Sequence, residues 1–307
     1  MIFPILVAVC SAVLAGSDCD DAQPQLKQVA AALEENDYPR AEKLLAPLED
    51  LSFRCPNVMI AVGRVALGKG DYRGATLYSE LALANAPDSA PALLLRAEVL
   101  SAAGQSAAAR DLLERACKSD SENAEAHFEL GKLLDAAKRN PQAAAEFERV
   151  IQLRPHDPQA HDYLALNLER LGEMTRADAA YMAGTKVNDG PRFDRLLDYN
   201  YGRFLLKVNR LSESKAHLDR ALELAPQVRA VRYDHAKLNV RLGKLEDARR
   251  DAEAALSLPD PNGFILDLQL YNLLATICTR LEDTESAQKY IELVQRTPIP
   301  MRSRERD

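Results

Sequence analysis

The stretch AEAHFELGKLLDAAKRNPQAAAEFERVIQLRPHD, residues 124–157, decides the fold. Its apolar residues recur at spacings of three and four, as at Leu130, Leu133 and Leu134. This spacing is typical of an amphipathic α-helix. Pro155 ends the stretch, because proline lacks the backbone donor that a helix needs and clashes with the preceding turn. The stretch therefore predicts a helix, a tight turn and a second helix.

A small residue returns about every 34 positions when the chain is followed outward from this stretch. Two further series of mostly small residues run twelve positions before it and seven positions after it. A fixed period of this length is the signature of stacked structural repeats, and small residues at fixed places allow helices to approach closely. The central series consists of Ala41, Ala75, Ala109, Ala143, Ala177, Ser214, Ala248 and Ala287, with short insertions before Ser214 and Ala287.

Glycine and proline follow the same period. Glycine easily adopts the left-handed conformation that ends a helix, and proline prevents a helix from continuing. We therefore expect each unit to turn at its centre and to stop at its end. The turn positions are Gly70, Gly104, Gly172 and Gly243, and the stop positions are Pro87, Pro155, Pro226 and, one residue early, Pro259.

These positions carry a family resemblance. Gly131, Ala143, Phe147 and Pro155 look like the tetratricopeptide signature at its 34-residue spacing, and the sequence resembles that family. The resemblance implies an all-α fold, a right-handed superhelical α-solenoid of helix-turn-helix repeats in which neighbours bury each other's apolar stripes. The eight expected repeats span residues 22–55, 56–89, 90–123, 124–157, 158–191, 195–228, 229–262 and 268–301.

The composition agrees with thin layers of packed helices. The 307 residues include no Trp and only 6% aromatic residues, but their 47% hydrophobic content is far from that of a disordered chain. The formal net charge is -7 and no long basic run occurs. Because phosphate backbones are neutralised by clustered Lys and Arg, nucleic acid is not expected as the main partner.

Residues 1–17 are expected to be a secretory signal peptide, and residues 18–307 a single solenoid. The opening segment has no charged side chain before Asp18 and ends in small-x-small patterns suited to a signal peptidase. It lacks the usual Lys or Arg at its start, so a retained membrane anchor is the alternative, although roughly 15 apolar residues are short for a span of about 20. We expect an exported bacterial protein, periplasmic or secreted, with membrane contact only if this segment is retained.

Four cysteines follow the signal segment. Cys19 and Cys55 each precede the first helix of a repeat. Because equivalent points of adjacent repeats are neighbours in the architecture that the resemblance implies, we predict a Cys19–Cys55 disulfide, which export would permit. Two free thiols are the alternative. Cys117 and Cys278 fall in distant repeats and are expected to be small buried apolar residues.

Local motifs for chemistry are weak. The segment Gly63 to Gly70 resembles a phosphate-binding loop, but it ends in glycine where a Ser or Thr must hold magnesium, so no nucleotide is expected. His127 and His161 occupy the same place in adjacent repeats and are expected to pack. A metal cluster with His156 is the alternative, but the usual ligand spacings are missing. We predict no metal, no cofactor and no catalytic residue.

The resemblance implies a concave groove lined by the first helices of the repeats, where related proteins bind extended or helical peptides. Basic and tyrosine side chains concentrate there in repeats six to eight, and spacings of four place them on one helical face. Arginine forms forked bonds to carboxylates, so an acidic protein or peptide partner is favoured. The alternative is a solvated face paired internally with Asp198, Asp234 or Glu246. The predicted groove residues are Tyr199, Arg203, Lys207, Tyr233, Lys237, Arg241 and Arg280.

The function expected from this groove is that of a non-catalytic interaction scaffold or adaptor of the cell envelope. One alternative is a hydrolase or transferase whose site is hidden among the repeats. Such a site should show a convergent acid, base or nucleophile, whereas an adaptor should show dispersed polar anchors. The other alternative is an architectural subunit that oligomerises through apolar patches on its convex face or its ends.

Overall fold

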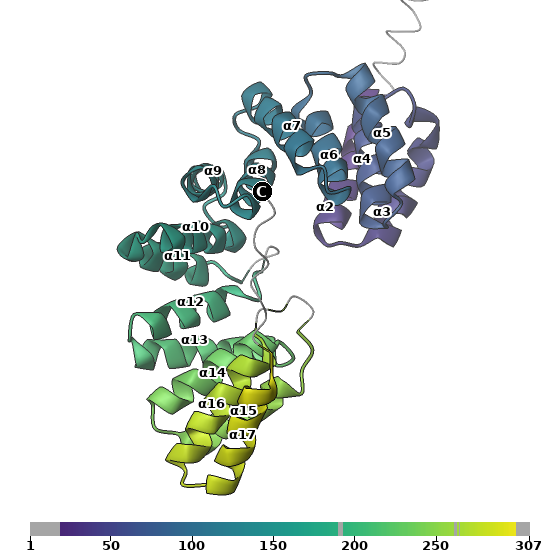
Figure 1. Cartoon of the computed structure of the whole chain (residues 1–307). Helices are drawn as coiled ribbons and strands as arrows, with labels where there is room; N and C mark the ends of the chain where they lie inside the picture. The colour runs from purple at the N-terminus through teal and green to yellow at the C-terminus, as the bar shows by residue number, and fades with distance from the viewer. Residues whose placement is uncertain (1–18, 190–192, 261–262, 264, 299–307) are drawn as a thin grey trace, which may run out of the picture. The chain divides into compact units, whose positions relative to one another are not determined.

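A computed structural model describes residues 19–189, 193–260, 263 and 265–298 (Figure 1). The expected signal peptide, residues 1–17, lies outside these residues. Over the described part of the chain every regular element is a helix, which confirms the all-α fold class. In the same residues, no helix is both long enough and apolar enough to cross a membrane.

The chain divides into two compact units, one comprising Met1–Ala177 and Asp189–Arg192 and the other Asp178–Asn188 and Phe193–Asp307. Helix α11 (Met174–Lys186) begins in the first unit and continues into the second. In the described residues, the other helices of the first unit are α2 (Gln23–Glu34), α3 (Tyr38–Leu45), the 3-10 helix η1 (Ala46–Leu51), α4 (Pro56–Gly68), α5 (Tyr72–Asn85), α6 (Ala90–Ala102), α7 (Ser106–Ser119), α8 (Ala124–Ala136), α9 (Asn140–Leu153) and α10 (Pro158–Leu171). The other helices of the second unit are α12 (Leu197–Lys207), α13 (Leu211–Leu224), α14 (Arg229–Arg241), α15 (Leu245–Leu256), α16 (Asp267–Arg280) and α17 (Thr284–Arg296).

Within each unit the helices pack as consecutive pairs (Figure 1). In the first unit α4 packs on α5, α6 on α7 and α8 on α9, and in the second α12 packs on α13, α14 on α15 and α16 on α17. The second helix of a pair also packs on the first helix of the next, as α5 does on α6 and α13 on α14. Each predicted repeat range contains two α-helices, except that α16 begins one residue before its range. A repeat therefore buries its apolar stripe against its neighbours.

The turn between paired helices has a left-handed residue at the same place in every repeat. Four of these residues are the glycines expected from the sequence, and four have side chains. A side chain in this conformation costs free energy, so the packing of the two helices imposes the turn even where glycine is missing. The turn residues are Asn36, Gly70, Gly104, Lys138, Gly172, Asn209, Gly243 and Glu282.

The series of small residues lies where the helices approach most closely. Seven of its eight members are fully buried, and the last, Ala287, is 6% exposed. Where the series has Ser214, the hydroxyl donates to the Gly202 carbonyl at 2.8 Å, so the buried polar group is satisfied. A Cβ atom at Gly131 would lie 2.9 Å from the ring of Phe147. Close helix contact thus explains why small residues recur at these places.

Cys19 and Cys55 form a disulfide, the pair that the sequence analysis selected. Their Cα atoms are 5.6 Å apart, and the bond spans 36 positions of sequence. Cys55 is buried at the start of α4 and packs in the amino-terminal core with Val29 and Val58. The disulfide therefore ties the beginning of the described chain to the second repeat.

Candidate functional site

A cavity of about 980 Å³ lies along α12 and α14 of the second unit. Residues four apart on a helix share one face, so a pattern repeated on both helices lines the same space. Arg280 of α16 lies outside the wall of this cavity, and its guanidinium donates to the Val240 carbonyl at 3.1 Å. The other six predicted groove residues belong to the wall: Tyr199, Arg203, Lys207, Tyr233, Lys237 and Arg241.

The wall of the cavity is basic although the chain as a whole is acidic. Clefts lined by charge of one sign concentrate ligands of the other sign. This cavity therefore favours an anionic ligand. Its wall carries the basic residues Arg203, Lys207, Arg229, Lys237 and Arg241 and the acidic residues Asp234 and Asp260.

Asp234 joins two residues of the wall. Its carboxylate is buried and accepts hydrogen bonds from Lys237 Nζ at 2.8 Å and from the Tyr199 hydroxyl at 3.0 Å. Burial, reinforced by Asp234, raises the pKa of Tyr199 well above its ordinary value, so the phenol remains a donor. Internal pairing, the alternative considered for this face, thus occurs between Asp234 and Lys237. Asp198 instead bonds to His217 Nδ1 at 2.7 Å.

Further contacts orient Lys237 and Arg241 in the wall of the cavity. Lys237 Nζ lies 5.1 Å from the centre of the Tyr233 ring, within range of a cation–π interaction. Arg241 donates to the Leu206 carbonyl at 3.2 Å and to Asn209 Oδ1 at 2.5 Å. These contacts hold the basic groups in place before a ligand binds, which lowers the entropy lost on binding.

The sequence analysis missed the part of the wall that comes from helix and loop ends. Arg229 is buried at the start of α14, donates to the Leu258 carbonyl at 3.2 Å and pairs with Asp267. Asp260 lies near the end of repeat seven and Ile265 lies within the insertion that follows it, and the Ile265 amide donates to Asp260 at 2.6 Å. The insertion was visible in the sequence, but only the fold decides which way such a loop runs.

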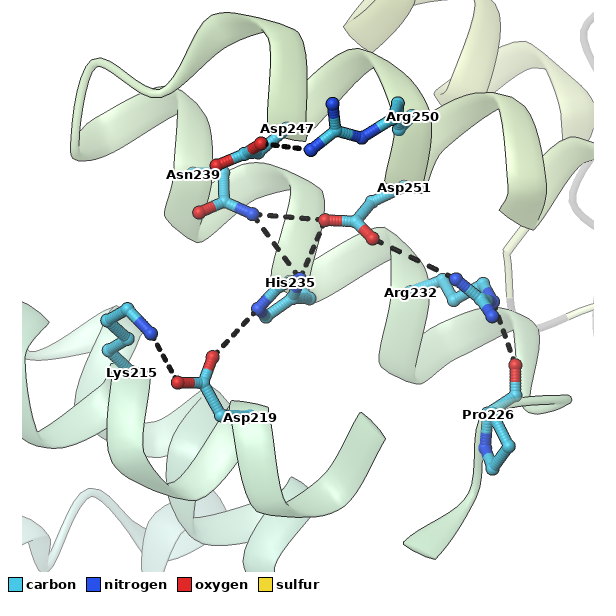
Figure 2. A network of polar contacts seen from close by, with 9 residues as sticks. All are labelled: Lys215, Asp219, Pro226, Arg232, His235, Asn239, Asp247, Arg250 and Asp251. Carbon is cyan, nitrogen blue, oxygen red and sulfur yellow. Dashed lines mark hydrogen bonds and ion pairs between the residues drawn. The ribbon is translucent and has the colours of Figure 1, made fainter. Parts of the chain in front are cut away.

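The other side of α14 is fixed by a polar network around His235 (Figure 2). His235 bonds to Asp251 of α15 at 2.7 Å and to Asp219 of α13 at 3.0 Å, and Asn239 donates to Asp251 at 3.0 Å. Burial acts to lower the pKa of His235, but the hydrogen bonds to Asp251 and Asp219 outweigh it and raise the pKa. Asp219 also pairs with Lys215. The network ties α14, which carries Lys237 and its neighbours, to the helices on both sides.

His127 and His161 of the first unit have separate partners. His161 Nε2 lies 3.1 Å from the Pro155 carbonyl, whereas His127 Nδ1 lies 2.6 Å from Glu146 Oε2. Cys117 is close to this second pair: one ligand atom of each of Cys117, His127 and Glu146 lies within 4.8 Å of the other two. Cys117 is half-buried rather than buried as expected. Burial, with Glu146 adding to it, raises the pKa of its thiol to about 12.

Comparison with protein families settles what the repeats are. Two family models, both described as tetratricopeptide repeat, match residues 61–124, 94–158 and 128–184 in one case and residues 199–228 and 268–296 in the other. Together these ranges cover more than half of the chain. The chain is a tetratricopeptide repeat protein. The matched ranges leave out the predicted repeats 22–55 and 229–262, whose helices the structure supplies.

Solved structures share the fold of this tetratricopeptide repeat protein. The crystal structure of the APC/C hetero-tetramer Cut9-Hcn1 has a TM-score of 0.66 at 17% identity and covers 81% of this chain, which spans only 48% of that chain. PilW, a widely conserved type IV pilus biogenesis factor, has a TM-score of 0.56 at 20% identity. The match covers 67% of this chain and 92% of the PilW chain. A tetratricopeptide repeat protein from Parabacteroides merdae ATCC 43184 has a TM-score of 0.52 at 14% identity. The match covers 84% of this chain and 99% of the Parabacteroides chain.

These identities establish a common fold and nothing more specific. No curated protein sequence matches the chain significantly. Family membership makes the protein an interaction scaffold, and scaffolds of this family are generally non-catalytic.

Proposed function

We propose that this tetratricopeptide repeat protein is a non-catalytic adaptor of the bacterial cell envelope that holds an acidic protein segment in the cavity of its second unit. The charge of the wall carries the proposal. Five basic side chains and two acidic ones surround the cavity, in a chain whose net charge is -7. An acidic segment would be attracted to this region and repelled by much of the remaining surface.

The size and chemistry of the cavity suit a short segment. Its volume of about 980 Å³ lies at the upper end of the range that holds small ligands, too little for a folded domain. Arg203 and Arg241 can each form two parallel hydrogen bonds to a carboxylate. Tyr199 and Tyr233 add amphipathic surface that packs against aliphatic parts of a peptide.

The same wall argues against catalysis. Over the residues that the structure describes, the wall contains no Ser, Cys or His that could act as nucleophile or base. Asp234 already accepts two hydrogen bonds from neighbouring side chains. Dispersed anchors of this kind favour holding a ligand over transforming it.

Two features support a location in the envelope. Residues 1–17 have the composition of a secretory signal. The Cys19–Cys55 disulfide suits an oxidising compartment, since such bonds are rare in the reducing cytosol.

A peptide-binding assay tests the proposal. Fluorescently labelled Asp- and Glu-rich peptides, and matched peptides with Asn and Gln, are titrated with residues 19–307 in the oxidised state. The acidic peptides should bind at least about tenfold more tightly than the matched Asn and Gln peptides. Added salt should weaken the binding of the acidic peptides, because it screens the electrostatic attraction. Reversing the wall charges in the variant R203E/K207E/K237E/R241E should abolish this preference.

The matched control is R64E/K132E. Arg64 and Lys132 occupy the place in repeats two and four that Arg203 and Lys237 occupy in repeats six and seven. The control should bind acidic peptides as the wild type does. A second variant with Gln at the four wall positions removes the positive charges without introducing negative ones. Circular dichroism checks that both wall variants are folded, so that a loss of binding can be assigned to the lost attraction. Equal binding by wild type and wall variants, or equal loss in the control, contradicts the proposal.

A further inference from the structure

Three side chains able to bind metal meet in the first unit, away from the basic cavity. Cys117 comes from α7, His127 from α8 and Glu146 from α9, so the cluster joins the end of one repeat to both helices of the next. One sulfur, one imidazole nitrogen and one carboxylate oxygen all lie within 4.8 Å of one another. Sulfur, nitrogen and oxygen from these residue types are the usual ligands of Zn²⁺.

The hydrogen bonding of His127 leaves one nitrogen without a partner. Its Nδ1 is 2.6 Å from Glu146 Oε2, and its Nε2 is buried with no hydrogen-bond partner. A carboxylate that accepts from one ring nitrogen fixes the tautomer, so the other nitrogen presents its lone pair. The same carboxylate–histidine arrangement orients histidines that bind metal. Buried polar atoms are otherwise almost always paired.

The charges around the cluster also favour a cation. The charged groups that act most on the Cys117 thiol are the carboxylates of Glu146, Asp120 and Glu114. Cys117 and Glu146 are both partly exposed, so an ion can reach them from solvent.

Other repeats show what is specific to this place. In repeat six Asp198 and His217 occupy the positions of His127 and Glu146 with the residue types exchanged, and they bond at 2.7 Å. That pair has Thr185 where the cluster has Cys117. An acid–histidine pair between paired helices is thus a recurrent structural contact, and the added sulfur distinguishes the first unit.

We propose that Cys117, His127 and Glu146 form a site for one thiophilic divalent transition-metal ion such as Zn²⁺. The sulfur and the imidazole bind the ion directly, and the carboxylate is the acidic partner of the site. Binding deprotonates the thiol and releases its proton to solvent. The ion would link two adjacent repeats at a point distant in sequence from the Cys19–Cys55 disulfide.

Cobalt titration tests this site, because a Co²⁺–thiolate bond gives a charge-transfer band in the near ultraviolet. Residues 19–307 are prepared with the disulfide intact and the two other cysteines reduced. The wild type should bind one Co²⁺ per chain with this band, and Zn²⁺ should displace it. The band should disappear in Cys117→Ser, and affinity should fall about 10- to 100-fold in His127→Gln and Glu146→Gln.

Cys278→Ser is the matched control, since Cys278 is the other free cysteine and lies in the second unit. This variant should keep the band. Zn²⁺ should raise the unfolding temperature of the wild type and of Cys278→Ser but not of Cys117→Ser, because a ligand that binds only the folded state stabilises it. No thiolate band in the wild type, or an equal band in Cys117→Ser, overturns the proposal. Circular dichroism confirms that each variant is folded.

Discussion

The two units place different charges at the same position of the repeat. In the first unit Arg64, Glu98 and Lys132 follow one another at 34-residue intervals, whereas in the second Arg203 and Lys237 do. A carboxylate oxygen of Glu98 lies 3.9 Å from a guanidinium nitrogen of Arg64. Lys132 and Lys237 each bond to the acidic residue three positions earlier, Glu129 at 2.7 Å and Asp234 at 2.8 Å, so this contact is common to both units. Alternating signs therefore compensate one another in the first unit, and like signs add up around the cavity of the second. A repeat fold keeps its packing while the side chain at this half-buried position changes the charge of each unit.

Burial of Glu98 in the first unit changes the pH at which its carboxyl ionises. Burial raises the pKa of Glu98 to about 7. The positive charge of Arg64 opposes this rise. Smaller effects come from Glu129 and Glu125, which raise the pKa, and from Lys132, which lowers it. The carboxyl thus changes charge near neutral pH.

The largest difference between the units should come from the disulfide. The double variant C19S/C55S removes a link across 36 positions, and loop-closure entropy predicts a loss of about 3 to 4 kcal/mol in the free energy of unfolding. Because repeats interact mainly with their neighbours, the loss should concentrate in the first unit. Hydrogen exchange should show less protection in α2 to α4 and unchanged protection in α14 to α17. Equal loss at both ends would mean that the units unfold together.

The second prediction concerns Glu98. The folded state binds its proton more tightly than the unfolded state, whose pKa is near 4.5, so the stability of the wild type should fall as pH rises from about 4.5 to about 7. Glu98→Gln should remove this dependence and stabilise the first unit at pH 8 by about 3 kcal/mol, because the pKa rises from 4.5 to about 7 on folding and each pKa unit corresponds to about 1.4 kcal/mol. Urea unfolding of the wild type and of Glu98→Gln at pH 5 and pH 8 measures the difference in stability. A variant that is no more stable than the wild type at pH 8 contradicts the prediction.

The third prediction uses the left-handed turn residues, which the units share. Lys138→Gly in the first unit and Glu282→Gly in the second should each stabilise the protein by roughly 0.5 to 1 kcal/mol, because glycine relieves the strain of positive φ. Gly172→Ala and Gly243→Ala are the reverse controls and should destabilise by about 1 kcal/mol. An added Cβ at these glycines meets no atom within 4 Å, so the effect is that of the backbone alone. Opposite signs in the two units would break the equivalence of the repeats.

The smallest expected effect belongs to His235 of the second unit. Its folded pKa is raised above the ordinary value of 6.5, so its contribution to stability is full below about pH 6.5 and is lost as pH rises through the folded pKa. Relative to His235→Gln, the wild type should lose stability over this higher pH window, whereas Glu98 acts at lower pH. Thermal unfolding from pH 5.5 to 8.5 measures the difference, with the exposed His156→Gln as control. A difference that does not change with pH contradicts the role of His235.

Much of the fold could be predicted because it depends on local, periodic properties. Burial of Ala143 and its equivalents follows from the 34-residue series, and the glycine turns follow from backbone conformation. The side chains of the cavity were predicted for a similar reason. Tyr199, Arg203 and Lys207 lie on one face of a helix whatever surrounds it, and Tyr233, Lys237 and Arg241 repeat the pattern.

The sequence by itself thus determined the paired helices, their turns and the face that carries positive charge, since each of these depends on spacing within one repeat. Only the tertiary structure decided that Asp234 would accept a bond from Tyr199, and that Cys117 would lie beside His127 and Glu146. These contacts join different helices through particular side-chain conformations. Which side chains meet depends on how closely neighbouring helices approach, and this distance cannot be read from the spacing of residues along the chain.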